Sequence, residues 1–69
     1  MWKIKEEKLK KLVNYGFEYE VDIINDYSIY VYELINIWLD GTFQINGPLS
    51  EKAISIIFKM FEDGMFEKK

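Results

Sequence analysis

The fold is decided by residues 18–45, which read EYEVDIINDYSIYVYELINIWLDGTFQI. Acidic and apolar side chains alternate from Glu18 to Ile23, so residues 18–24 have the pattern of a half-buried β-strand. Asn25 and Asp26 tolerate positive φ, so we expect a two-residue turn there. Residues 28–39 are rich in β-branched and aromatic side chains, and they predict a second strand or two short ones.

A second turn signal follows directly. Asp40-Gly41 is the strongest short hairpin signal in the chain, and residues 42–45 form the return strand. The turn residues Asn46-Gly47-Pro48 then end the sheet. This stretch therefore predicts an antiparallel meander of three strands, or of four if its central segment is split.

Residues 3–15 predict a helix before the sheet. Gly16 is expected to take the left-handed conformation after its last turn, with Phe17 folding back onto Leu12. The apolar side chains that fall on one side at helical spacing are Ile4, Leu9, Leu12 and Val13. Lysine and glutamate cover the remaining sides of this helix.

A second helix follows the sheet. Ser50 is a good N-cap, residues 53–61 are apolar over an arc wider than that of an ordinary surface helix, and Gly64 stops it. The sequence therefore predicts a single α+β domain over residues 1–69: an N-terminal helix, a three- or four-stranded antiparallel meander, and a C-terminal helix packed on the sheet.

Two end segments carry a resemblance. Leu12-Val13-Asn14-Tyr15-Gly16-Phe17 follows a lysine-rich helix, and the chain closes with Phe61-Glu62-Asp63-Gly64-Met65-Phe66-Glu67-Lys68. In these segments and in the order of its elements, the chain resembles small uncharacterised proteins from phages and prophages of low-GC Gram-positive bacteria. The shared motifs are helix caps, so the resemblance implies a phage-type accessory role and carries over no functional residue.

The two turns predict which side chains share a face of the sheet. With two-residue turns at both sites, Ile23 lies opposite Ser28 and Trp38 lies opposite Phe43. The first face then holds Tyr19, Val21, Ile23, Tyr30, Tyr32, Leu34, Trp38, Phe43 and Ile45. The opposite face holds Glu18, Glu20, Asp22, Ile29, Val31, Glu33, Ile35, Ile37, Leu39, Thr42 and Gln44. We expect the helices to cover the first face, and a one-residue change in either loop would swap the faces of a strand.

The central strand is apolar on both sides, whereas a sheet with one wet face carries polar residues at alternate positions. Contiguous exposed apolar area usually marks an interaction surface. We therefore predict that the second face binds a protein partner or a second copy of the chain. The residues predicted to make this contact are Ile29, Val31, Ile35, Ile37 and Leu39. The alternative is a sandwich, with one helix covering each face.

Composition bears on the chemistry open to the chain. Cysteine and histidine are absent, which removes the cysteine nucleophile, the commonest general base and the usual zinc ligands. Arginine, the favoured bidentate ligand of phosphate, is absent too. Ser50 is explained as a cap, and Glu18, Glu20 and Asp22 lack the loop spacing of a calcium site. We therefore predict no enzymatic activity, no catalytic residue, no metal site, no cofactor and no small-molecule substrate.

Charge is divided along the chain. Residues 3–14 carry five lysines and two glutamates, whereas residues 16–50 carry six acids and no base. An acidic sheet repels nucleic acid, which is bound through basic side chains, so the leading prediction is a protein-binding accessory protein, alone or as a homodimer. The alternative function is a nucleic-acid-associated module that uses the lysine-rich helix. No signal peptide or membrane span is visible, and we predict a cytoplasmic location.

Overall fold

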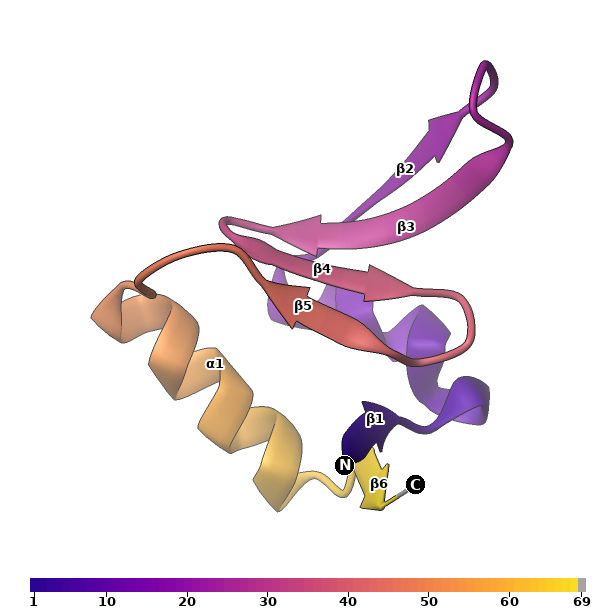
Figure 1. Cartoon of the computed structure of the whole chain (residues 1–69). Coiled ribbons are helices and arrows are strands. Elements are labelled where there is room, and N and C mark those ends of the chain that lie inside the picture. The colour runs from indigo at the N-terminus through magenta and orange to yellow at the C-terminus, as the bar shows by residue number, and fades with distance from the viewer. Residues whose placement is uncertain (69) are drawn as a thin grey trace.

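The computed structural model describes residues 1–68, and Figure 1 shows how their elements are arranged. In chain order the elements are β1 (Trp2–Ile4), η1 (Glu6–Tyr15), β2 (Glu18–Asp22), β3 (Tyr27–Tyr32), β4 (Ile35–Trp38), β5 (Phe43–Ile45), α1 (Glu51–Glu62) and β6 (Phe66–Lys68). The predicted α+β class is confirmed, with two helices, a four-stranded antiparallel sheet and a second sheet of two strands. Neither helix within these residues is long and apolar enough to cross a membrane.

The larger sheet is a meander with the strand order β2-β3-β4-β5. Its fourth strand arises because a two-residue turn at Glu33 and Leu34 divides the predicted central segment. Tyr32 lies opposite Ile35 across this turn, and Glu33 has a positive φ of 50°. A non-glycine residue seldom takes that conformation, so the sequence gives no turn signal at this point.

This turn changes which residues share a face. The face that meets the core, here called the inner face, holds Tyr19, Val21, Ser28, Tyr30, Tyr32, Ile35, Ile37, Phe43 and Ile45. The outer face holds Glu18, Glu20, Asp22, Tyr27, Ile29, Val31, Asn36, Trp38 and Gln44. The predicted faces were wrong for β4, because Ile35 and Ile37 are on the inner face and Trp38 is on the outer one.

The other two turns also differ from the expected geometry. The first spans four residues, 23–26, so Tyr19 lies opposite Tyr30. That is a shift of two positions, which leaves the faces of β2 and β3 as predicted. In the last hairpin Ile37 lies opposite Phe43, a shift of one position from the predicted pair, which exchanges the faces of β4.

The N-terminal helix, η1, is a 3₁₀ helix. Such a helix has three residues per turn, so side chains three positions apart stack on one ridge. Leu9, Leu12 and Tyr15 have this spacing, and the two leucines are buried. Val13, which α-helical spacing placed on the apolar side, is exposed.

The predicted cap of this helix is confirmed. Gly16 ends η1 with a φ of 102°, and the Phe17 amide donates to the Leu12 carbonyl at 3.2 Å. Phe17 is buried and contacts Tyr32 of β3, with 5.5 Å between the ring centroids. The cap therefore directs the chain from η1 into β2.

The two ends of the chain form a small sheet that the sequence did not predict. β1 and β6 pair antiparallel, with Ile4 opposite Phe66, although Ile4 was expected in a helix. The Ile4 amide donates to the Gly41 carbonyl at 2.8 Å, and the Lys5 amide donates to the Met65 carbonyl at 2.9 Å. The small sheet is thereby attached to the loop between β4 and β5.

The C-terminal helix, α1, has the predicted caps. The Ser50 hydroxyl accepts a hydrogen bond from the Ala53 amide at 3.1 Å, and Gly64 has a φ of 71° after the last turn. The same hydroxyl donates to the Glu33 carboxylate at 2.9 Å. This bond ties the start of α1 to the turn between β3 and β4.

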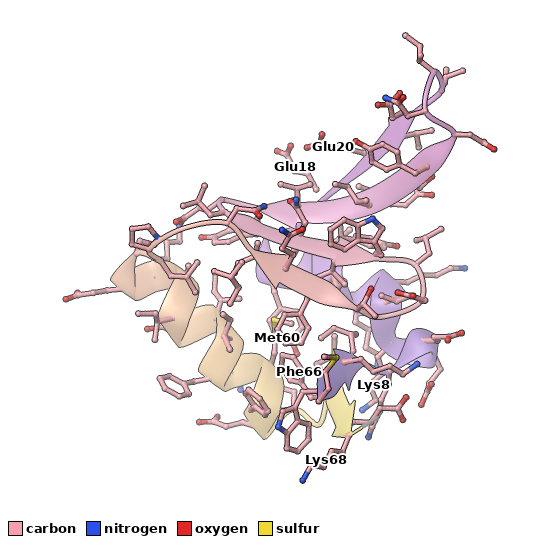
Figure 2. The ribbon with its side chains drawn as sticks, viewed as in Figure 1. Lys8, Glu18, Glu20, Met60, Phe66 and Lys68 are labelled. Carbon is pink, nitrogen blue, oxygen red and sulfur yellow. The ribbon has the colours of Figure 1, made fainter. Side chains whose placement is uncertain are left out.

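The core lies between the inner face, the helices and the small sheet. Its buried members are Ile4, Leu9, Leu12, Phe17, Tyr30, Ile35, Ile37, Ala53, Met60 and Met65. Figure 2 shows Met60 and Phe66 in this interior. Of the residues of α1, Ala53 and Met60 are buried, so most of the wide apolar arc of that helix is only partly covered.

Candidate protein-contact surface

The five residues predicted to form one contact surface do not lie together. Ile35 and Ile37 are 2% and 1% exposed and belong to the core. Ile29 and Val31 are on the outer face, where the first is buried and the second half-buried. Leu39 is exposed in the loop after β4. The predicted surface is therefore divided between two faces and a loop, because the unforeseen turn reverses β4.

The outer face is mixed in character. Ile29 lies between Glu20 and Trp38 on the neighbouring strands, and Val31 lies opposite Asn36. Polar and apolar residues are thus mixed across this face, and one row holds Glu18, Val31, Asn36 and Gln44. The central segment was predicted to be apolar on this face along its whole length, and that was wrong for β4, which places Asn36 there.

A different apolar surface lies on the hairpin made by β2, the turn 23–26 and β3, which we call the hairpin arm. The arm projects beyond the rest of the sheet (Figure 1). Ile23 and Ile24 at its tip are 88% and 94% exposed. Behind them on the strands, Tyr19 and Val21 are exposed on the inner face and Tyr27 is exposed on the outer face. Exposed apolar side chains gathered in this way are typical of interaction sites.

The tip of the arm has a defined conformation. The Asp22 carboxylate accepts hydrogen bonds from the Asn25 amide at 3.0 Å and from its side-chain nitrogen at 2.8 Å. These bonds lower the pKa of Asp22 below its ordinary value, so the carboxylate stays ionised and keeps accepting them. Asp26 completes the turn with a φ of 54°.

Sequence reasoning missed the tip because it counted Ile23 and Ile24 as strand. The available signal was Asp22 three positions before Asn25, since an Asp side chain bonds nearby backbone amides in turns. With the turn closed by these bonds, both isoleucines lie outside the strands and are exposed.

β2 forms one edge of the larger sheet, and within residues 1–68 it pairs with β3 only. Glu18, Glu20 and Asp22 are on its outer face, and Tyr19 and Val21 are on its inner face. Figure 2 shows Glu18 and Glu20 on the side of the sheet away from Met60. Among residues 1–68, the acids found in ion pairs are Glu6, Glu67 and Asp63, none of which belongs to β2. The edge therefore offers an acidic row on one side and an apolar row on the other.

A second exposed apolar area lies on α1. Ile54, Phe58 and Phe61 follow one another at helical spacing and are exposed. The Trp2 ring meets Phe61 edge-on, with 5.7 Å between the centroids. Beside this area a pocket of about 120 Å³ opens between α1 and the sheet. Its lining is wholly apolar and consists of Phe17, Ile35, Ile37, Phe43, Ile45, Ile57, Met60, Phe61 and Phe66.

Two of the N-terminal lysines make contacts within the chain. The Lys3 ammonium lies 3.4 Å from the Glu6 carboxylate and 3.5 Å from that of Glu67. The Lys8 ammonium donates to the Asp63 carbonyl at 3.5 Å. Two of the five lysines are thus engaged with acidic residues or a helix end, which weakens the case for a phosphate-binding row.

One titratable pair joins the two helices. The Tyr15 hydroxyl donates to the Asp63 carboxylate at 2.6 Å. Burial raises the pKa of Tyr15 to about 12, and the hydrogen bond to Asp63 adds to the increase. The same bond lowers the pKa of Asp63. Both changes keep the Tyr15 phenol neutral and the Asp63 carboxylate charged, which preserves the hydrogen bond between them. The pair therefore links η1 to the end of α1.

Among residues 1–68, no three acidic side chains come close enough together to hold a metal ion.

The chain was compared with protein-family models, with curated proteins and with solved structures, and no match was found in any of the three.

Proposed function

We propose that this protein is a non-enzymatic accessory protein of the phage type, and that it acts in the cytoplasm by binding another protein through the hairpin arm. The observation that supports this proposal most directly is the exposure of Ile23 and Ile24 on a turn closed by Asp22 and Asn25. The partner covers the tip and the exposed side chains behind it.

The energetic reason lies in the side chains at the tip. Full burial of an isoleucine side chain contributes about 1.5–3 kcal/mol relative to exposure. Within residues 1–68, two adjacent isoleucines at the tip gain almost none of this in the free protein. A partner that covers both side chains would add this burial free energy to the free energy of binding, less the cost of association. Because the turn is already fixed by hydrogen bonds, little further ordering of the arm is needed.

The experiment is affinity capture from an extract of the native host, with and without nuclease. We expect the wild-type chain to retain one host protein, nuclease or not. The double variant Ile23→Ser with Ile24→Ser should lose it, because it removes both tip side chains without touching the core.

The matched control is Val13→Ser with Ile54→Ser, which also removes two exposed aliphatic side chains, but on the two helices rather than on the arm. Loss of capture in the control and not in the arm variant would move the contact to the helices and defeat the proposal. Retention that depends on nucleic acid and falls steeply with salt would favour the nucleic-acid alternative. Sedimentation of the purified chain reports whether a homodimer forms.

A further inference from the structure

The outer edge of β2 suggests how a partner would be held on the hairpin arm. We propose that β2 accepts an extended segment of the partner as a fifth strand, and that this segment alternates basic and apolar residues. The inference rests on the proposed function, since it names the binding mode and the chemistry of the partner at that same arm.

The backbone of β2 is the first part of the case. β2 stands at the end of the strand order β2-β3-β4-β5, and within the described part of the chain its ladder runs to β3 alone. An edge strand presents backbone donors and acceptors that can pair with another chain. Strand addition to such an edge takes its affinity from the main chain and its specificity from alternate side chains.

The side chains of β2 determine what that specificity is. Residues two apart on a strand lie on one face about 6.8 Å from each other. Glu18, Glu20 and Asp22 therefore form an evenly spaced acidic row, while Tyr19 and Val21 are half or more exposed on the other face. A strand laid against this edge meets acids on one side and apolar groups on the other.

A second copy of this chain is a poor occupant of the edge. If two copies joined through β2 in antiparallel fashion about a two-fold axis normal to the sheet, like faces would be continuous. Glu20 would then lie beside Glu20 of the other copy, and Glu18 beside Asp22. Like charges directly opposite one another destabilise a strand pair, so repulsion between the acidic rows disfavours self-association through this edge.

A partner strand with the complementary pattern has no such penalty. Lysine or arginine at every second position would face Glu18, Glu20 and Asp22, and opposite charges across neighbouring strands stabilise the pair. The intervening residues, if β-branched or aromatic, would pack against Tyr19 and Val21. At the end of β2 the exposed Ile23 and Ile24 would extend the apolar contact beyond the strand.

The test uses the whole chain and three blocked synthetic heptapeptides: KVKVKVK, its block rearrangement KKKKVVV, and EVEVEVE. Binding is measured by titration calorimetry, and the site by amide chemical shifts and hydrogen exchange. We expect KVKVKVK to bind at least tenfold more tightly than KKKKVVV and to protect amides of residues 18–22 from exchange. EVEVEVE should not bind.

Charge reversal provides the matched variant. Glu18→Lys with Glu20→Lys changes two exposed side chains, and its preference should switch from KVKVKVK to EVEVEVE. Glu18→Gln with Glu20→Gln, a milder change, should weaken KVKVKVK binding without the switch. Equal binding of KVKVKVK and KKKKVVV, shifts located away from β2, or an unchanged preference in the reversed variant would each overturn strand addition.

The two proposals can fail separately. If capture of the host protein requires Ile23 and Ile24 but tolerates the reversal at Glu18 and Glu20, strand addition is overturned and the arm remains the contact. If capture tolerates both sets of changes, both proposals are overturned.

Discussion

At the scale of single residues, the helix ends formed by glycine were the easiest features to predict from the sequence. Gly16 and Gly64 have the positive φ values that the sequence predicted, and the Ser50 hydroxyl caps α1. The turn at Glu33 was not predictable, because glutamate is seldom used at positive φ. Its conformation is supported from a distance by the Ser50 hydroxyl, which donates to the Glu33 carboxylate.

Gly41 and Gly64 allow a matched test of how much positive φ and a close backbone contact each contribute to the requirement for glycine. Both have positive φ, at 90° and 71°, and an alanine is strained at either position. A Cβ on Gly41 would also overlap the backbone oxygen of Ile4, whereas on Gly64 it would meet only the end of Lys8, 3.6 Å away. We expect Gly64→Ala to lower the free energy of unfolding by about 1 kcal/mol and Gly41→Ala by about 3 kcal/mol. Urea denaturation measures both, and equal losses would mean that the β1 contact is not tight.

At the scale of elements, the sequence predicted where strands and helices lie better than what kind they are. Residues 3–15 have apolar side chains that fit both a period of 3.6 and a period of three, and the buried pair Leu9 and Leu12 fits either. Tyr15 decides between them, because it continues the three-residue spacing. β1 and β6 were missed because three-residue strands are too short to show alternation. They also form by pairing with one another from opposite ends of the chain, which no local pattern reveals.

The link between η1 and α1 predicts a pH dependence. The pKa of Tyr15 is raised in the folded protein to about 12, so its neutral form stabilises the fold. That contribution is complete below about pH 10, the ordinary value for tyrosine, and it is lost as the pH rises towards 12. We expect the free energy of unfolding to fall more steeply between pH 10 and 12 in the wild type than in Tyr15→Phe. Urea denaturation at both pH values measures this, with Tyr27→Phe on the arm as control. Parallel slopes for wild type and Tyr15→Phe would contradict the link.

At the scale of the whole molecule, one turn had the largest consequence. The pattern of the central strand predicted an exposed apolar surface, and exposed apolar side chains do occur, but on the hairpin arm and on α1 rather than across the outer face. Register follows from turn length, so the error at β4 moved Ile35 and Ile37 from the predicted contact surface into the core. Predicting the arm would have required knowing that Ile23 and Ile24 form the turn itself.

The partial burial of the apolar side of α1 leads to the last prediction, which concerns the stability of the entire domain. A chain of this length has roughly 3–10 kcal/mol of stability in total. Met60 is 1% exposed and lines the apolar pocket between α1 and the sheet. Met60→Ala enlarges a space that already exists, and we expect it to cost about 3 kcal/mol, a large share of the total. Phe58, 63% exposed on the same helix, is the matched site, and Phe58→Ala should change stability by no more than about 0.5 kcal/mol. Thermal and urea unfolding of the two variants distinguish these outcomes. Similar losses from both would show that the outer side of α1, rather than its contact with the pocket, holds the helix in place.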